Sequence, residues 1–185
     1  MKPISFRRFG RPCLLLLCVA LLAGCATVPP GSCEHFEQTR RASRYETTYR
    51  YSETDTRLAQ KNFAPLRSGE PITARWYTLR SNRAVIRGCD HLYLTKDLYL
   101  LRGTNGAGSL HEVREVFTSD GTSIATKRED VTAQLKASGF YSASVPLPIP
   151  KQAPPGAYRI VTKLIAKTNG SERALATASV DFRVQ

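Results

Sequence analysis

The chain has 185 residues, of which 42% are hydrophobic and 23% are charged, and it contains 12 Gly, 11 Pro and 5 Cys. This composition is typical of a globular domain and excludes a collagen, a low-complexity chain and a disulfide-dense miniprotein, and the length indicates one domain. The formal net charge of +12 would suggest a nucleic-acid partner in a cytosolic protein.

The first 24 residues have the pattern of an export signal. Lys2, Arg7, Arg8 and Arg11 come first, without any acidic residue, and an apolar run over residues 13–23 follows. A basic start, a short apolar run and small residues at its end are typical of a secretory signal peptide. The run is too short for a transmembrane helix, which needs about 20 apolar residues. We therefore expect residues 1–24 to be a signal peptide.

The end of this segment, Leu22-Ala23-Gly24-Cys25, resembles a bacterial lipobox, and residues 1–25 together resemble a bacterial lipoprotein signal peptide. The resemblance implies cleavage before Cys25, diacylation of its thiol and acylation of the new amine. Each buried methylene contributes about 0.8 kcal/mol, so several acyl chains would hold the protein in the bilayer permanently. Ala26 stands where an Asp would imply inner-membrane retention. The resemblance therefore implies an outer-membrane lipoprotein on the periplasmic face, given a Gram-negative source.

Removal of the signal peptide leaves a basic protein. Residues 1–24 contain four of the 27 basic residues and none of the 15 acidic ones, so the net charge falls from +12 to +8. An exported protein does not routinely meet nucleic acid, and no nucleic-acid partner is expected. The basic surface would face anionic lipid headgroups, anionic glycans or an acidic protein. A solvated basic surface without any partner is the alternative.

The cysteines divide into three groups. Cys13 and Cys18 leave with the signal peptide, Cys25 carries lipid, and Cys33 and Cys89 remain. An even pair in an oxidising compartment suggests a disulfide. Two buried free thiols, or a reactive Cys89, are the alternatives. Redox or zinc chemistry is not indicated, because the sequence has no CxxC or HEXXH spacing.

The mature chain divides into a lipidated N-terminus with a flexible tether, residues 25–43, and one strand-rich domain, residues 44–185. Pro29-Pro30-Gly31-Ser32 has turn chemistry. Beyond residue 44 the apolar residues mostly recur at every second position, which indicates half-buried strands. Strands are expected in these segments: 44–51, 72–79 with Ile72, Ala74 and Trp76 on one face, 84–87, 92–101, 113–117 and 140–147.

Two hairpins are predicted from turn residues and parity. A two-residue Asp120-Gly121 loop would place Phe117 opposite Ile124. At the C-terminus the apolar residues on both sides of residue 170 are even-numbered. A two-residue loop would put these sets on opposite faces, so we expect either a three-residue loop or an added bulge. The expected core of this hairpin is Tyr158, Ile160, Leu164, Val180, Phe182 and Val184.

Many short strands with regular turn signals predict an all-β fold, an antiparallel β-sandwich. Pro155-Gly156-Ala157-Tyr158 followed by alternation resembles the late-strand pattern of immunoglobulin-like bacterial envelope domains, a resemblance of fold only. At most one short helix is expected, near residues 130–138. There Asp130 could cap a helical turn, Val131 and Leu135 are four residues apart, and Gly139 would end it.

The sequence offers little catalytic chemistry. It has no GxSxG motif, and His35 lies in the predicted tether. Asp90-His91 and His111-Glu112 could each form an acid–base pair, but isolated histidines at strand edges are usually solvated. The acidic residues Glu112, Glu115, Glu129 and Asp130 are not spaced like a calcium loop, so a solvated face is the better interpretation. We expect no enzyme activity, no metal and no cofactor.

One aromatic and basic cluster consists of Arg44, Tyr45, Tyr49, Arg50 and Tyr51. Aromatic and Arg side chains are good anchors, so this cluster could bind a glycan or a peptide. The alternative is a strand with its tyrosines in the core and its arginines in solvent.

Two functions follow from these observations. The first is a membrane-anchored, non-enzymatic accessory lipoprotein that binds a protein partner in the envelope, with strand addition as a natural mode. The second is a binding module for an anionic glycan or lipid through a basic face.

Overall fold

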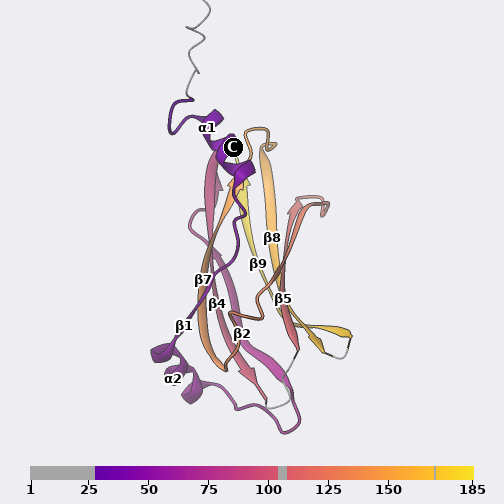
Figure 1. Cartoon of the computed structure of the whole chain (residues 1–185). Coiled ribbons are helices and arrows are strands. Elements are labelled where there is room, and N and C mark those ends of the chain that lie inside the picture. Colours follow the sequence, from indigo (N-terminus) through magenta and orange to yellow (C-terminus); the bar gives the residue numbers. More distant parts are fainter. Residues whose placement is uncertain (1–27, 104–107, 169) are drawn as a thin grey trace, which may run out of the picture.

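The computed structural model describes residues 28–103, 108–168 and 170–185. The predicted signal peptide and Cys25 lie outside the described residues. Two sheets pack face to face in an elongated sandwich (Figure 1). The four-stranded sheet has the order β1 (Tyr49–Ser52), β7 (Gly139–Ile149), β4 (Asp90–Arg102), β2 (Ile72–Ser81). The five-stranded sheet has the order β3 (Val85–Ile86), β9 (Ser171–Val184), β8 (Gly156–Thr168), β5 (Ser109–Thr118), β6 (Ser123–Asp130).

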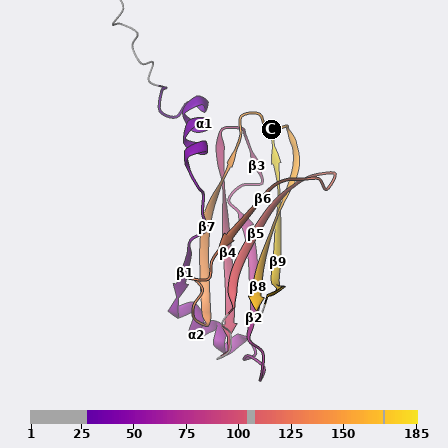
Figure 2. The ribbon, with the colours of Figure 1, turned by 45° about the vertical axis from the view of Figure 1, so that its right-hand side comes forward.

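All strand pairs are antiparallel except the short β3–β9 pair, which is parallel. The predicted all-β, antiparallel sandwich is therefore confirmed. One helix lies at each end of the sandwich (Figures 1 and 2): α1 (Cys33–Ala42) at the end where the chain terminates, and α2 (Glu53–Asn62) at the opposite end.

The helices differ from the prediction of at most one, near residues 130–138. Helix α1 occupies part of the predicted tether, and its N-cap Ser32 accepts a hydrogen bond from His35 N at 3.1 Å. Helix α2 follows β1 directly, and Ser52 caps it by accepting from Asp55 N at 3.3 Å. A side-chain oxygen at this position satisfies one of the free N–H groups of the first turn. Both helices thus begin at a capping serine.

Residues 130–138 form a turn. Asp130 accepts a hydrogen bond from Thr132 N at 2.9 Å, and such a local bond competes with helix formation. The N–H groups of Gln134 and Leu135 both donate to Val131 O at 3.1 Å. Val131 and Leu135 are nevertheless fully buried, so the apolar spacing here serves core packing.

A bulge in β2 explains why Trp76 does not share a face with Ile72. The register with β4 shifts between Ala74 and Trp76, so Arg75 is an extra residue. An extra residue exchanges the two faces of a strand. Ile72 is therefore buried, Trp76 is 45% exposed, and Leu79 returns to the core.

The β5–β6 hairpin also carries an extra residue, and the predicted pairing of Phe117 with Ile124 is wrong. Thr118 N donates to Thr122 O at 3.0 Å, and Gly121 has a positive φ of 86°. The loop therefore has three residues, with a left-handed glycine at its end. Phe117 pairs with Ser123 and Val116 with Ala125, so that Ile124 becomes the bulged residue.

In the C-terminal hairpin the predicted bulge is confirmed. Thr168 pairs with Ser171, and the register then shifts opposite Leu164 and Ile165. Beyond the shift, even residues pair with even ones, as in Tyr158 with Phe182. All six predicted core residues of this hairpin are buried except Val180, which is partly buried against the core.

The core contains two apolar clusters with a polar layer between them. The cluster nearer α1 includes Leu92, Leu94, Val116, Ile160 and Phe182, and the cluster nearer α2 includes Leu98, Leu100, Leu110, Leu164 and Ile72. Between them three strands place polar side chains in the interior: Lys96 on β4, Glu112 and Arg114 on β5, and Thr162 on β8.

Candidate functional site

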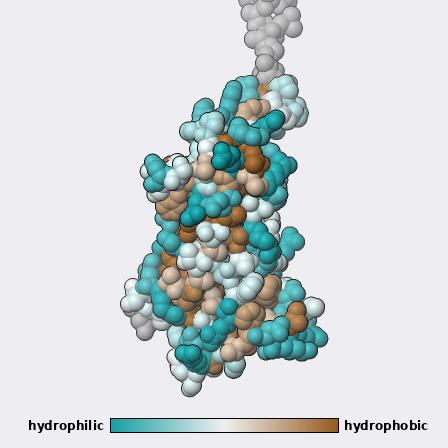
Figure 3. All heavy atoms as spheres, turned by 180° about the vertical axis from the view of Figure 1, so that it is seen from behind, coloured by the Kyte–Doolittle hydropathy of each residue, from teal (hydrophilic) through white to brown (hydrophobic). Residues whose placement is uncertain are grey.

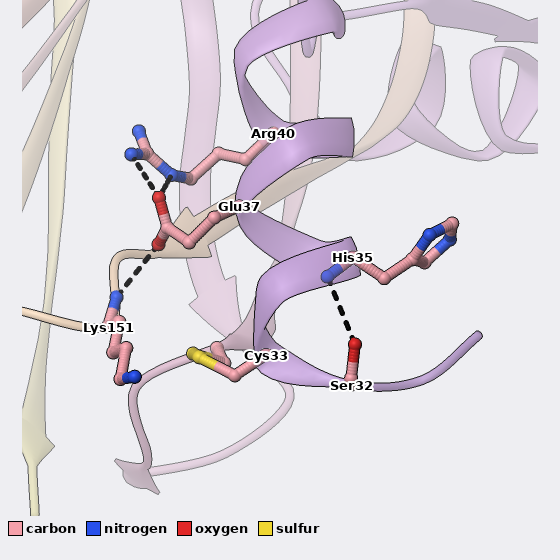
Figure 4. The surroundings of a disulfide bond; sticks show 7 residues. Ser32, Cys33, His35, Glu37, Arg40 and Lys151 are labelled. Carbon is pink, nitrogen blue, oxygen red and sulfur yellow. Dashed lines mark hydrogen bonds and ion pairs between the residues drawn. A yellow bond between two sulfur atoms is a disulfide. The ribbon is translucent and has the colours of Figure 1, made fainter. Parts of the chain in front are cut away.

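Helix α1 is fixed to the sandwich by a disulfide. Cys33 is bonded to Cys89, with the two Cα atoms 5.2 Å apart, which confirms the predicted bridge. Glu37 reinforces the attachment, since its Oε1 accepts from Lys151 N at 2.9 Å and its Oε2 from Arg40 Nη2 at 2.7 Å (Figure 4). The hydrogen bond from Arg40, followed by that from Lys151, holds the pKa of Glu37 below its ordinary value. His35 points away from the bridge (Figure 4).

The other face of α1 packs on aromatic rings. The ring of Phe36 lies 4.8 Å from that of His91, and His91 Nε2 lies 3.2 Å from Tyr45 OH. Asp90 does not reach this ring: its Oδ1 accepts from His91 N at 2.7 Å, and its Oδ2 accepts from Arg83 at 2.7 Å. Asp90-His91 therefore does not form the acid–base pair that its sequence allowed. His111 likewise lies 3.1 Å from Ser109 Oγ, while Glu112 points into the core.

An apolar cavity of about 410 Å³ opens beside α1. Its size lies within the range of small-molecule sites. Most of the wall comes from apolar side chains: Val116, Ile124, Ala125, Leu147, Pro148, Ile149, Pro150, Ala153, Pro154, Tyr158, Phe182 and Val184. Two polar residues complete the wall, Arg40 from α1 and Gln152 from the loop after β7. We call this space the α1 cavity.

The α1 cavity exists because the sandwich is not closed on one side. β1 pairs only with Phe140–Ala143 of β7, so among the described strands the rest of this β7 edge has no partner. β6 is the edge of the other sheet. Seen from behind, apolar residues reach the surface as separate patches among hydrophilic ones (Figure 3). This face therefore offers local apolar sites instead of one broad apolar area.

The predicted aromatic and basic cluster is not one surface. Tyr45 packs against His91, Tyr49 is buried, and Tyr51 stacks edge-on against Tyr141 with ring centroids 5.5 Å apart. Arg44 and Arg50 are exposed. The alternation expected for residues 44–51 holds for Tyr45, Thr47 and Tyr49, but β1 begins only at Tyr49 and turns into α2 after Ser52. The predicted binding residues therefore face different surroundings.

The structure buries an ion pair that the sequence analysis missed. Lys96 Nζ donates to Glu112 Oε1, and both side chains are fully buried. Two tyrosine hydroxyls also donate to this carboxylate, Tyr49 at 2.5 Å and Tyr77 at 3.1 Å. Thr47 Oγ1 lies 3.1 Å from Glu112 Oε1 but only 2.8 Å from Glu129 Oε2, to which it donates. The predicted solvated face for Glu112 and Glu129 is thus wrong. Parity was the available signal, because Lys96 lies in phase with Leu92, Leu94, Leu98 and Leu100, and Glu112 with Leu110 and Val116.

Burial sets the acidity of this cluster. Burial lowers the pKa of Lys96, against the attraction of Glu112, and burial raises the pKa of Tyr49 and Tyr77. Burial opposes ionisation of Glu129, but hydrogen bonds from Thr47 and the charge of Arg114 outweigh it and lower the pKa of this carboxyl. Lys96 and Glu112 are closed to solvent, so the cluster has the geometry of an internal support and not of a substrate site.

Over residues 28–103, 108–168 and 170–185 no three His, Cys, Asp or Glu side chains lie close enough to hold a metal ion. Within the same residues no helix has the length and hydrophobicity needed to cross a membrane.

Comparisons with known proteins give distant similarities only. No protein-family model matches the sequence, and no curated protein matches it. The CARDB domain of a Pyrococcus furiosus protein is 13% identical over 62% of this chain and 87% of that domain, with a TM-score of 0.37. The C-terminal domain of Wzt is 12% identical over 69% and 84%, with a TM-score of 0.40. A Clostridium perfringens family 123 glycoside hydrolase is 13% identical over 76% and 27%, with a TM-score of 0.38. Similarities at this level carry no inference about ligand or activity.

Proposed function

We propose that the protein is an outer-membrane lipoprotein, anchored through acylated Cys25 on the periplasmic face, which binds a partner in the envelope without catalysing a reaction. The observation that carries the binding role is the α1 cavity, an apolar space with few polar groups at the end of the domain from which the chain leads towards Cys25. A cavity of this kind is the default position for a ligand or an anchoring group of a partner. The anchor itself rests on the lipobox resemblance.

Replacement of Cys25 by Ser tests the anchor. We expect the Cys25→Ser variant to lose palmitate labelling and to leave the membrane fraction. Unchanged labelling would contradict the anchoring proposal.

Photocrosslinking in the cell envelope tests the binding role. A photoreactive residue in place of Ile124, at the rim of the α1 cavity, should give a defined crosslinked product. The matched control is the same residue in place of Leu58 on α2, because these side chains are similarly exposed, at 53% and 58%. Identical products at both positions would contradict a partner site at the cavity.

A second proposed role is binding of an anionic lipid or glycan surface through basic residues. The observation in its favour is a group of exposed cationic side chains near the same end: Arg41, Arg87, Lys151 and Arg183. β3 pairs with the end of β9, and Gly88 lies against the backbone of Lys151, which gathers Arg87, Lys151 and Arg183. Cationic residues near an anchored segment add attraction to anionic headgroups.

A test of this second role uses the double variant Arg87→Glu/Arg183→Glu of the lipidated protein. In vesicles containing phosphatidylglycerol, contact with the membrane should protect this end of the wild-type domain from proteases, and added salt should weaken that protection. The double variant should not be protected. The matched control reverses two exposed cations elsewhere, Lys61→Glu/Lys136→Glu. Equal protection of the two variants would contradict the role.

A further inference from the structure

The polar groups around the α1 cavity restrict what can occupy it. The hydroxyl of Tyr158 donates to Pro154 O at 2.7 Å, so this hydrogen-bond donor is already used within the wall. Arg40 and Gln152 are the two polar side chains among the lining residues. A sugar would need many hydrogen-bond partners, because polar groups that lose water without replacement cost free energy. The cavity therefore does not suit a glycan.

The edge of β7 restricts the occupant further. Beyond Ala143 this edge has no partner among the described strands, but Pro146 and Pro148 stand within it. Proline has no N–H to donate, so prolines on an edge strand prevent the pairing of a further strand. Addition of a partner's strand along this edge, the binding mode expected from the sequence, is therefore disfavoured.

The dimensions and the rim favour an extended apolar group. An engineered cavity of about 150 Å³ already holds benzene, so the α1 cavity at about 410 Å³ has room for more than one ring. Ile124, which the β6 bulge turns to the rim, is 53% exposed. An exposed apolar side chain at a cavity mouth is covered when an apolar ligand enters.

The rim also carries a positioned cation. Arg40 donates from Nε at 3.1 Å and from Nη2 at 2.7 Å, in both cases to Glu37 Oε2. Glu37 is itself held by Lys151 N, so Arg40 is fixed in direction while its Nη1 takes no part in these bonds. A fixed guanidinium is well suited to a carboxylate or a phosphate.

We propose that the α1 cavity binds the acyl chain of a free anionic amphiphile, with the carboxylate or phosphate of its head at Arg40. The protein's own acyl chain at Cys25 is a different source of the same apolar group, but it would bring no anionic head to Arg40. This proposal rests on the proposed function and names the partner of the same site.

The test uses the lipidated protein in phosphatidylcholine vesicles with a photoactivatable palmitic acid and, separately, the corresponding uncharged palmityl alcohol. After irradiation, crosslinked peptides are identified by mass spectrometry. We expect the acid to label peptides that contain Ile124 or residues 147–154. The acid should give about tenfold more label than the alcohol, since a charge-assisted hydrogen bond contributes roughly one decade of affinity.

Two pairs of variants make the assignment specific. Ala125→Phe, and separately Ala153→Phe, should abolish labelling by filling the cavity, whereas Ala174→Phe, at an exposed position of β9, should leave it unchanged. Arg40→Gln should remove the preference for the acid, and Arg57→Gln should retain it, because Arg57 lies on α2 at the other end of the sandwich and likewise pairs with a Glu of its own helix. Circular dichroism of each variant verifies the fold.

Three outcomes would overturn the proposal. The first is labelling that does not change in Ala125→Phe and Ala153→Phe. The second is equal labelling by acid and alcohol in the wild type. The third appears in cells grown on photoactivatable palmitate: a crosslink from the acyl chain of Cys25 into the cavity peptides would show that the protein's own chain is the occupant. A protein product from position 124 without acyl labelling would overturn this proposal but leave the binding role intact.

Discussion

Replacement of Lys96 by Met is the most direct test of the polar layer in the core. The substitution removes the ammonium group from the Glu112 carboxylate while it retains an unbranched apolar stem of similar length. Both side chains are fully buried, so the carboxylate would lose its ion-pair partner and would have no access to water. We expect the variant to fold with clearly reduced stability.

The expected magnitude follows from burial. Removal of one partner of a buried ion pair costs about 3–5 kcal/mol. Two hydroxyl donors remain on Glu112, from Tyr49 and Tyr77, and they place the expected loss near the lower end, about 3 kcal/mol. A domain of this kind has a free energy of unfolding of about 5–15 kcal/mol, so the loss should be readily measured.

The assay is urea unfolding followed by circular dichroism, with the disulfide oxidised. The matched control is Lys163→Met. Lys163 of β8 pairs at 2.7 Å with Glu115, which lies on β5 like Glu112, but the Lys163 side chain is 40% exposed. An exposed pair contributes about 0–1 kcal/mol. The double variant Lys96→Met/Glu112→Leu should remain destabilised, since the hydroxyls of Tyr49 and Tyr77 lose their acceptor. Equal losses for the two lysine variants would refute the reasoning.

Three further predictions concern other parts of the fold. The Cys33→Ser/Cys89→Ser variant should lose about 4 kcal/mol of its free energy of unfolding in the chain-entropy model, given a sequence separation of 56 residues. Reduction of the wild-type disulfide should cause an equal loss, and an unchanged free energy of unfolding would contradict the prediction. Phe182→Ala should cost about 3–5 kcal/mol in urea unfolding, because Phe182 is 4% exposed and stacks on a neighbouring ring; a loss below about 1 kcal/mol would be inconsistent with its core position. Stability should also fall in acid. The folded-state pKa of Glu129 lies below its ordinary value of 4.5, so its contribution is complete above that value and is lost as pH falls through the folded pKa. Glu129→Gln should flatten this part of the curve, and a curve parallel to that of the wild type would exclude Glu129 as its source.

Much of the fold could be predicted from period and parity. The even-numbered apolar residues of the last two strands required a bulge or an odd loop, and the bulge is present. The extra residues at Arg75 and Ile124 could not be predicted, because a bulge changes no local apolar pattern until its partner strand is known. Helix α2 had a readable signal in Ser52 followed by Asp55, a capping pair. This capping pair directly follows the alternating residues 44–51, and the prediction followed the strand period of those residues instead.

The candidate site was less accessible to sequence reasoning than the fold. The disulfide was predicted by counting cysteines in a chain that we expected to be exported. The α1 cavity draws its wall from α1, from four strands of one sheet and one of the other, and from a loop, so its lining residues range from Arg40 to Val184 in the sequence. Such a space depends on which edges remain unpaired, and this is a property of topology. The bulge at Ile124, which made the predicted pairing of Phe117 with Ile124 wrong, also brings the Ile124 side chain to the rim of the α1 cavity.

The covalent bridge at Cys33 determines how the domain would bear a mechanical load. A pull applied to the chain before Cys33 passes through the sulfurs to Cys89 and enters β4, a strand of 13 residues bonded on both sides, to β7 and β2. Helix α1 and the four-residue strand β1 lie outside this path and carry no tension. When the bridge is reduced, the same tension would reach β1 instead, and β1 could peel from β7 one residue pair at a time.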